Sequence, residues 1–249
     1  MPAHVLQYST AAAQLRPPRC AAPLLVTVDP YGSDTWRLDP IIALLREGAL
    51  GIIPTDSFPA LVCDVDARQA VERLYAAKDM APTKQLSIMC RSFADVAEYT
   101  LGFPAPQPGR PDAFRLARQA LPGPYTLILH ASKRLPKQCV DYLTGKAKQR
   151  RTVGVRLPGD PICQAVLAGL ERPLLCSSVH VEAGVGALEL PEAAVMLDMF
   201  EPRGIDFVVD AGVTVAEGST IIDLTGRDPE LLRAGKGDAG VFLPDPVYA

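Results

Sequence analysis

The stretch GALGIIPTDSFPALVCDV, residues 48–65, decides how the rest of the chain is interpreted, because an apolar run is interrupted in its middle. Its first residues have the composition of a buried strand, and so do residues 60–65. Between them lies PTDSFP, residues 54–59, with two prolines and three polar side chains. A plain core strand gains nothing from either. We therefore predict a strand that ends at a polar loop, with hydroxyl groups and a carboxylate facing a cleft.

The bulk composition is that of a globular protein with one large α/β domain or two smaller ones. Of the 249 residues, 48% are hydrophobic and 21% are charged. The net charge of −3 gives no general attraction for polyanions, so any such binding needs a local patch. No apolar run is as long as a membrane span, and we predict no membrane partner.

The six cysteines and three histidines do not form a metal-binding pattern. No CxxC pair occurs, and His4, His130 and His180 are scattered along the chain. We therefore predict no metal site. Three cysteines stand in apolar runs, which favours buried free thiols in a reducing compartment over disulfides. They are Cys63, Cys90 and Cys176.

The N-terminal residues differ in composition from the rest of the chain. Residues 1–28 are rich in alanine, hold no acidic residue and include Arg16 and Arg19. Such a segment is either an organelle-targeting sequence, for a chloroplast or mitochondrion, or a disordered extension. The compartment therefore stays open between cytoplasm and organelle. We predict an extension over 1–28, one domain over 29–243 and a short tail over 244–249.

From residue 29 onward, helix and strand patterns alternate. This alternation predicts an α/β domain in which helices cover a largely buried sheet. Helices are expected from 39 to 47, after residue 66, and at 92–100, 112–120, 160–169 and 191–200. Strands are expected at 49–53, 60–65, 86–90, 125–131, 152–157, 173–178, 205–209, 219–224 and 230–234.

Several of the predicted strands begin or end on small polar or basic residues. In an open α/β sheet such positions line the ligand crevice, and hydroxyls beside Arg and Lys suit a phosphate or nucleotide. Each position alone also fits an ordinary turn, but their recurrence favours a site. Arg156 stands inside the apolar run TVGVRLP and needs an anionic partner. The other positions are Thr55-Asp56-Ser57, Ser177-Ser178 and Ser219-Thr220.

Six blocks of the sequence resemble, in the same order, those of the YrdC-like family, and most closely its YciO branch. They are IIPTDSFPAL, AAKDMAPTKQLSIM, LPGPYTLIL, TVGVRLPGDP, PLLCSSVH and GSTIIDLT. The family blocks read PTDTxYGL, KxRxxxKPL, PGPxT, VRxP, TSAN and STIxD. The resemblance extends from about residue 40 to residue 235. It implies a single α/β domain of the YrdC/RibB-like type, with a twisted open mixed sheet and helices around a concave basic cavity.

The resemblance also implies an activity and roles for single residues. Characterised YrdC-type enzymes make L-threonylcarbamoyladenylate from ATP, L-threonine and bicarbonate, for the threonylcarbamoyladenosine modification of tRNA. ATP with Mg²⁺ would be a substrate complex, and no tightly bound cofactor is implied. Thr55 would contact threonine, and Lys78 would hold the phosphates or the carbamate. The implied catalytic residues are Lys78, Ser178 and His180, and the implied binding residues are Thr55, Lys84, Thr126, Arg156, Ser219 and Arg233. Lys84 as a solvated lysine and Thr126 as an ordinary strand residue remain alternatives.

The chain departs from the family pattern at four positions. The KxR arginine is Met80 and the TSAN asparagine is His180, while Pro59 and Ala60 replace a tyrosine and a glycine. Methionine offers neither a charge nor a donor, and loss of one charge-assisted contact commonly costs about 10²–10³ in rate. We therefore predict that any synthase activity is weak.

A basic stretch supports a rival interpretation. Residues 132–151, SKRLPKQCVDYLTGKAKQRR, carry seven basic side chains and one acid, Asp141. A solvated loop and an RNA-binding patch at the cavity rim are both open. The second alternative makes the protein a non-catalytic module that binds double-stranded RNA, tRNA or a nucleotide. Its RNA-binding residues are Lys133, Arg134, Lys137, Lys146, Lys148, Arg150 and Arg151. A riboflavin-pathway synthase of related fold is disfavoured, because we find no acid and histidine cluster for its metal.

Overall fold

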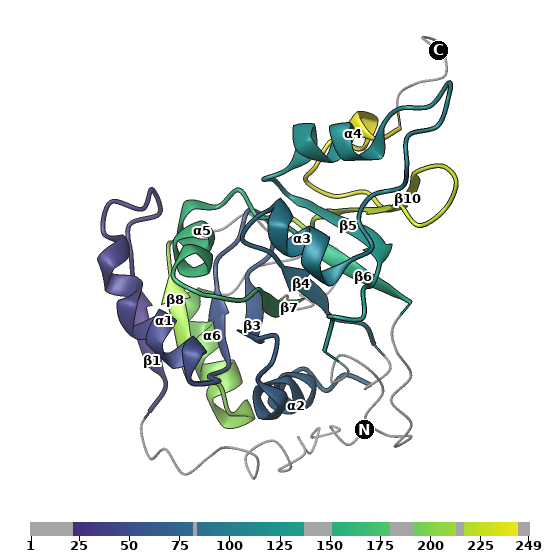
Figure 1. Ribbon diagram of the computed structural model, residues 1–249. Coiled ribbons are helices and arrows are strands. Elements are labelled where there is room, and N and C mark those ends of the chain that lie inside the picture. The colour runs from purple at the N-terminus through teal and green to yellow at the C-terminus, as the bar shows by residue number, and fades with distance from the viewer. Residues whose placement is uncertain (1–21, 82–83, 137–150, 180–191, 213–216, 244–249) are drawn as a thin grey trace, which may run out of the picture.

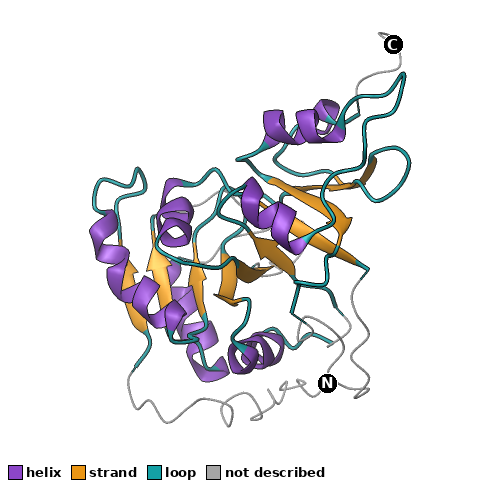
Figure 2. Cartoon of the chain, viewed as in Figure 1, coloured by secondary structure: helices purple, strands orange, loops and turns teal. Residues whose placement is uncertain are grey.

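The computed structural model describes residues 22–81, 84–136, 151–179, 192–212 and 217–243. These residues form one sheet of ten strands, in the order β1-β8-β2-β3-β7-β4-β6-β5-β9-β10. Helices flank the sheet, and α1 and β1 lie at the opposite end of the molecule from α4 and β10 (Figures 1 and 2). The predicted single α/β domain with an open mixed sheet is confirmed.

The strands and helices follow the predicted alternation. The strands are β1 (Leu24–Thr27), β2 (Gly51–Ile53), β3 (Ala60–Asp64), β4 (Ser87–Met89), β5 (Tyr125–His130), β6 (Thr152–Arg156), β7 (Leu174–Ser178), β8 (Phe207–Asp210), β9 (Thr220–Asp223) and β10 (Glu230–Arg233). The helices are α1 (Asp39–Arg46), α2 (Arg68–Ala77), α3 (Phe93–Tyr99), α4 (Ala113–Ala120), α5 (Pro161–Ala168) and α6 (Ala193–Phe200). Short 3₁₀ helices are η2 (Thr35–Leu38), η4 (Glu201–Arg203) and η5 (Ala239–Val241).

The sheet is mixed because late strands insert between early ones. Strand β8 pairs in parallel with both β1 and β2, and β7 pairs antiparallel with both β3 and β4. Strand β6 lies parallel to β4 and antiparallel to β5, and β5 lies parallel to β9. The outer strands are β1 and β10, so the sheet does not close into a barrel.

Two apolar cores lie on opposite faces of the sheet. One contains buried residues of α1 and α5, and the other contains buried residues of α2, α3, α4 and α6. Ile52 belongs to the second core and Ile53 to the first, since successive side chains of a strand point to opposite faces. Both faces of β2 and β3 are buried, which explains the uninterrupted apolar runs on either side of residues 54–59.

The sheet begins earlier in the chain than the composition suggested. Strand β1 lies inside residues 1–28, which the sequence predicted as an extension, and that prediction is wrong for residues 24–27. Leu24 pairs with Phe207 and Thr27 with Asp210 in a regular parallel register. The four-residue run LLVT carries little periodicity of its own, and pairing with β8 makes it a strand. Residues 1–21 and 244–249 lie outside the described residues.

The other expectations from composition concern membranes and thiols. In the described part of the chain, no helix has the length and apolarity needed to cross a membrane. The free thiols predicted from the apolar runs are confirmed, because Cys63, Cys90 and Cys176 are buried and free. Cys163 is buried and free as well.

Candidate functional site

A cavity of about 210 Å³ lies on the sheet face that α1 and α5 cover. Cys176 shows that the cavity lies on this face, since its side chain belongs to the core under α1 and α5 and also lines the cavity. The other lining residues come from β4, β5, β6, β7, β9 and β10, and from the segment between α2 and β4. Segments far apart in the sequence therefore build this one hollow.

The floor of the cavity is a row of small side chains on three neighbouring strands. Ser87 of β4 is paired in register with Cys176 of β7 on one side and with Gly154 of β6 on the other. A Cβ atom at Gly154 would lie 2.5 Å from Ser87 Oγ and 3.1 Å from Thr126 Cγ2. The absence of a side chain at Gly154 therefore lets the cavity-lining side chains of Ser87 and Thr126 pack closely over the strand.

The end of α2 brings Lys78 to the cavity. Lys78 follows the last turn of the helix, and its Nζ donates a hydrogen bond of 2.8 Å to the carbonyl oxygen of Ser178 at the end of β7. Asp79 has a φ of +48°, a left-handed conformation that Asp adopts more readily than most residues. This single residue separates Lys78 from Met80, and both side chains line the cavity.

The cavity wall carries positive charge. Lys78, Lys84, Arg156 and Arg233 line it, and no described lining residue is Asp, Glu or His. Burial lowers the pKa of Lys78 to about 8, with smaller contributions from the charges of Lys84 and Arg203. Burial, and then the charge of Arg156, also lower the pKa of Arg233. An anionic ligand relieves the mutual repulsion among such neighbouring cations.

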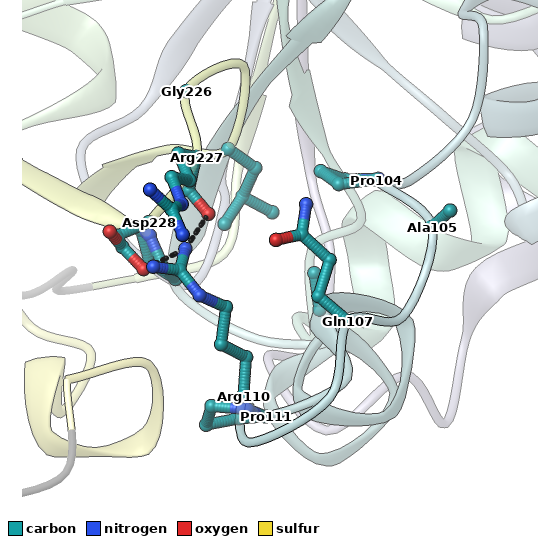
Figure 3. A pocket seen from close by; sticks show the side chains of 11 residues that line it. Pro104, Ala105, Gln107, Arg110, Pro111, Gly226, Arg227 and Asp228 are labelled. Carbon is teal, nitrogen blue, oxygen red and sulfur yellow. Dashed lines mark hydrogen bonds and ion pairs between the residues drawn. The ribbon is translucent and has the colours of Figure 1, made fainter.

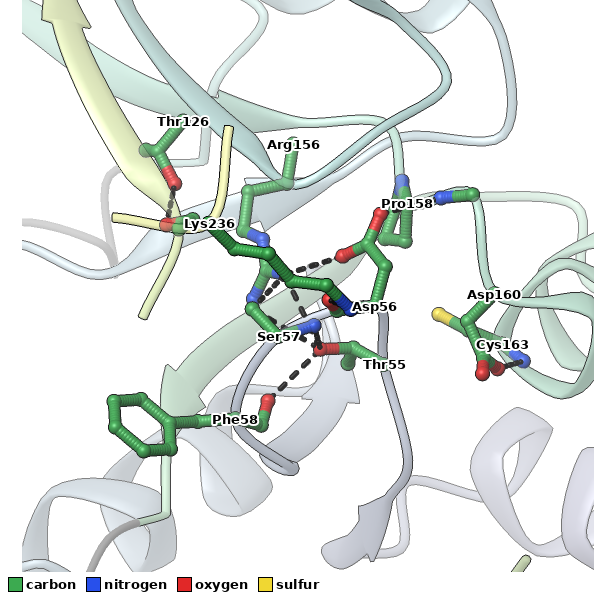
Figure 4. A network of polar contacts seen from close by, with 12 residues as sticks. Thr55, Asp56, Ser57, Phe58, Thr126, Arg156, Pro158, Asp160, Cys163 and Lys236 are labelled. Atoms are coloured by element: carbon green, nitrogen blue, oxygen red, sulfur yellow. Dashed lines mark hydrogen bonds and ion pairs between the residues drawn. The ribbon is translucent and has the colours of Figure 1, made fainter. Parts of the chain in front are cut away.

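Arg156 is held in place by the loop that interrupts the opening stretch. Its Nη2 donates hydrogen bonds to Ser57 Oγ at 2.7 Å and to Thr55 Oγ1 at 3.2 Å, and lies 3.2 Å from Asp56 Oδ1 (Figure 4). The prediction that this arginine needs an anionic partner is confirmed. The polar side chains of 54–59 face Arg156, so the expectation that they face the open cleft is wrong. They accept hydrogen bonds from the guanidinium, which brings them behind the cavity wall.

Asp56 is fixed from two further sides. Its Oδ2 accepts a hydrogen bond from the Gly159 amide at 2.6 Å, and its carbonyl oxygen accepts one from Lys236 Nζ at 2.8 Å. Figure 4 shows the Lys236 side chain running across the front of Arg156 toward Asp56. The segment after β10 thus holds the 54–59 loop from the outside while Arg156 holds it from within.

A second polar cluster joins β5, β9 and β10. Thr126 and Ser219 share a hydrogen bond of 2.8 Å between their hydroxyl groups. Arg233 donates to the Ser219 carbonyl oxygen from Nη2 at 2.8 Å and from Nε at 3.2 Å. Three side chains that the resemblance assigns to the binding site therefore form one hydrogen-bonded cluster.

The structure brings most of the predicted site residues together. Those that line the cavity are Lys78, Lys84, Thr126, Arg156, Ser178, Ser219 and Arg233. Thr55 is buried behind Arg156, where its hydroxyl donates to the Phe58 carbonyl oxygen at 2.8 Å. Met80 occupies the KxR arginine position on the cavity wall, and its Sδ accepts a hydrogen bond from Ser177 Oγ at 3.7 Å. His180 lies outside the described residues.

Sequence reasoning did not single out four residues of this region. Ser87, Gly154 and Cys176 form the floor, and Lys236 holds the loop. The floor residues are small and carry no pattern, so only the register of three strands reveals them. Lys236 follows Arg233 closely in the chain, and this proximity to a predicted site residue was the one sequence feature that could have indicated its role.

The predicted basic patch lies only partly in the described residues. Lys133, Arg134 and Arg151 are described, and Arg134 Nε pairs with Glu98 Oε1 at 3.0 Å on the surface. Arg151 precedes β6 and Arg156 ends it, so the two lie at opposite ends of the strand, about 16 Å apart. Arg151 does not line the cavity, and its expected place at the cavity rim stays a prediction. Outside the described residues lie Lys137, Lys146, Lys148 and Arg150.

Two further features of the described residues concern metal binding and a second hollow. Within the described ranges, no three His, Cys, Asp or Glu side chains are grouped as a metal site requires. A smaller hollow of about 40 Å³ lies between the proline-rich loop at 104–111 and the turn between β9 and β10. Arg110 reaches across it to the carbonyl oxygen of Arg227 and forms an ion pair with Asp228 (Figure 3). Its two sides are thus joined by contacts within the protein.

Comparison with known proteins places the chain among relatives of one type. A family model described as Sua5_yciO_yrdC, telomere recombination, matches residues 43–235. YciO of Escherichia coli K12 is 29% identical over 216 residues, which cover 87% of this chain and 97% of the relative. A threonylcarbamoyl-AMP synthase of Pyrococcus abyssi is 29% identical over 203 residues, which cover 81% of this chain and 55% of the relative.

Solved structures give the same result. The crystal structure of E. coli YciO superposes with a TM-score of 0.73 at 26% identity and covers 88% of this chain and 99% of that one. The crystal structure of P. abyssi Sua5 complexed with L-threonine superposes with a TM-score of 0.68 at 27% identity. It covers 86% of this chain and 58% of that one.

Proposed function

The chain belongs to the Sua5/YciO/YrdC family, and from this premise we propose that its cavity performs the reaction of a threonylcarbamoyl-AMP synthase. In this reaction a nucleotidyl group is transferred. The carbamate of L-threonine, formed from bicarbonate, attacks the α-phosphate of ATP bound with Mg²⁺, and pyrophosphate leaves. The observation that carries the proposal is the cavity lined by four cationic side chains, with hydroxyl groups and with no carboxylate or imidazole among its described lining residues.

The cations form two separate groups, which fit the two anionic parts of such a substrate pair. The charge of Lys84 lowers the pKa of Lys78, and the charge of Arg156 lowers the pKa of Arg233. We assign the carbamate to the side of Lys78 and Lys84, and the phosphates to the side of Arg156 and Arg233. Fixed cations at both places stabilise the charge that develops when the phosphoanhydride breaks.

Met80 makes the proposed activity weak. Met80 lines the cavity, so the chain lacks a cation where the KxRxxxKPL pattern of the family has an arginine. The thioether sulfur accepts one hydrogen bond, from Ser177, and donates none. We expect turnover about 10²–10³ below that of a relative with the arginine, the usual effect of one lost charge-assisted contact.

The test is release of pyrophosphate with Mg-ATP, bicarbonate and a panel of amino acids, with mass spectrometry to identify the adenylate. Calorimetry with Mg-ATP alone measures nucleotide binding separately. We expect slow, bicarbonate-dependent release that is fastest with L-threonine. Absence of heat at millimolar Mg-ATP, together with absence of pyrophosphate, contradicts the proposal.

Met80→Arg sharpens this test, because it restores paired donors at the cavity wall. We expect turnover to rise at least about 10-fold. Gln119→Arg adds the same charge on the exposed face of α4 and serves as the control. An equal rise in both variants assigns the effect to overall charge and removes the special role of this position.

Binding of tRNA or double-stranded RNA stays a prediction from the sequence. The three described residues of the basic patch do not line the cavity, and one of them is paired with Glu98. No observation on the described residues favours this alternative over the synthase. The cytoplasmic or organellar location likewise stays a prediction.

A further inference from the structure

The proposed reaction needs a group that accepts a proton. An amino acid carries its α-nitrogen as an ammonium at neutral pH, and an ammonium has no lone pair with which to attack carbon. Carbamate formation therefore requires that one proton leave the nitrogen before or during the attack. The usual acceptors in active sites are carboxylates and imidazoles, and neither occurs among the described lining residues.

Most of the remaining lining groups are also excluded as proton acceptors. Serine and threonine hydroxyls are too weakly basic, and arginine remains protonated in proteins. The thiol of Cys176 is buried, and burial raises its pKa to about 11, so it stays protonated as well. Lys84 is exposed to solvent, whereas Lys78 is half-buried. Lys78 is left.

The surroundings of Lys78 favour its neutral form. After burial, the charges of Lys84 and Arg203, both cations, lower the pKa of Lys78 further. Arg203 is fixed nearby through a 3.0 Å hydrogen bond to the Ala77 carbonyl oxygen. The Ser178 carbonyl oxygen and the C-terminal end of α2 favour the ammonium. Burial outweighs them, and with a pKa of about 8 roughly one-tenth of the side chain is neutral at pH 7.

We propose that Lys78 Nζ, in its neutral form on the cavity wall, is the general base that takes the proton from the α-ammonium of the amino acid. This role rests on the proposed function. The proton moves to Nζ, the N–H electron pair stays on the α-nitrogen, and the free amine combines with bicarbonate to give the carbamate and water. The lysine returns its proton to solvent before the next cycle. The positive charge left on Lys78 then lies beside the carbamate, which it stabilises for attack on the phosphate.

The first test needs no turnover. Reductive methylation of the full chain with formaldehyde and cyanoborohydride, followed by mass spectrometry of the peptides, measures the reactivity of each lysine from pH 6.5 to 10.5. We expect half-maximal labelling of Lys78 near pH 8, with a midpoint below that of Lys133, an exposed lysine. Equal midpoints for the two lysines overturn the proposal.

The second test uses Lys78→Arg, which keeps the positive charge but cannot accept a proton at neutral pH. We expect kcat to fall about 100-fold or more while the Kd for Mg-ATP changes less than about threefold. In wild type kcat rises with pH through about 8, and this rise disappears in the variant. Lys133→Arg is the matched control and leaves both kcat and its pH profile unchanged.

His180, which lies outside the described residues, is the alternative candidate for the general base. The variant His180→Gln distinguishes its role from that of Lys78. If the rise with pH disappears in His180→Gln and persists in Lys78→Arg, the role passes to the histidine. Turnover combined with a Lys78 labelling midpoint above about 10 overturns only the role of Lys78. Absence of turnover with a midpoint near 8 overturns the synthase assignment, and with it the role of Lys78 in that reaction.

Discussion

Arg73 in α2 and Arg156 at the end of β6 are both buried, and each has an Nε atom without a hydrogen-bond partner in the described structure. Their surroundings differ. Arg73 Nη2 contacts Asp206 Oδ2 at 2.6 Å and the Gly204 carbonyl oxygen, where α2 packs against the segment before β8. Arg156 contacts the 54–59 loop and lines the cavity. The first region is closed within the protein, whereas the second is open to a ligand.

The charges around the two arginines explain this difference. Arg73 and Asp206 form a pair of opposite charges, and Asp206 also accepts a hydrogen bond from the Leu50 amide. Around Arg156 the carboxylates of Asp56 and Asp160 face three cations, because Arg233 and Lys236 lie in the same region. A buried cation therefore stabilises the fold where a carboxylate matches it. It offers binding energy where the match is incomplete.

Arg73→Ala should produce the larger effect on stability. Removal of the guanidinium leaves Asp206 partly buried without its partner, which typically costs about 3–5 kcal/mol. We expect the free energy of unfolding in urea to fall by that amount. Asp206→Asn with Arg73→Met removes both charges and should recover part of the loss. A fall below about 1 kcal/mol in Arg73→Ala would show that the pair is not a structural one.

Arg156→Ala should affect ligand binding more than stability, whereas Arg73→Ala should mainly affect stability. We expect the Kd for Mg-ATP to rise about 100-fold, because a charge-assisted contact in a water-poor site is lost. Lys133→Ala removes an exposed lysine outside the cavity lining and should change the Kd less than about twofold. Calorimetry measures the Kd for Mg-ATP of both variants, after circular dichroism has shown that each has the native fold. Equal losses would reduce the role of Arg156 to overall electrostatics.

Lys236→Met should give the smallest effect, because this lysine is exposed and acts through the 54–59 loop. The expected change is a rise of about fivefold in the KM for ATP with kcat and the melting temperature nearly unchanged. Lys236→Arg should restore KM. Faster hydrogen exchange of the Gly159 amide, which binds Asp56, would report loosening of the loop without any ligand. An unaltered exchange rate removes the holding role of Lys236.

The sequence predicted those parts of the site in which a polar or charged residue interrupts an apolar run. Arg156 and the hydroxyls of residues 54–59 stand out because polar groups interrupt apolar runs, and a buried charge must find a partner. Hydroxyl groups at the ends of several strands could be brought together because ligand crevices in open sheets form at strand ends. The order of six blocks then indicated the family, which the comparison confirms.

Other parts of the site depend on pairing between distant strands, and no local pattern encodes that. Gly154 and Cys176 look like ordinary strand residues until β4 aligns them in one row. Strand β1 is short and is defined by its partner β8. Lys78 was recognised as a cation, but its lowered pKa follows from burial against α2 and β7, which only the folded chain provides.

The position of β7 in the middle of the sheet has a consequence for how the chain is made. Ala60 of β3 pairs with Ser178, and Ser87 of β4 pairs with Cys176, so neither early strand has this neighbour until residue 178 has been synthesised. During translation the apolar strands β3 and β4 therefore have unpaired edges until β7 has been synthesised. Unpaired strand edges favour aggregation and binding by chaperones. Pairings between such distant segments are also intrinsically slow. The cavity takes residues from β7, β9 and β10, so it can form only after residue 233 has been synthesised, and a shorter nascent chain lacks the complete site.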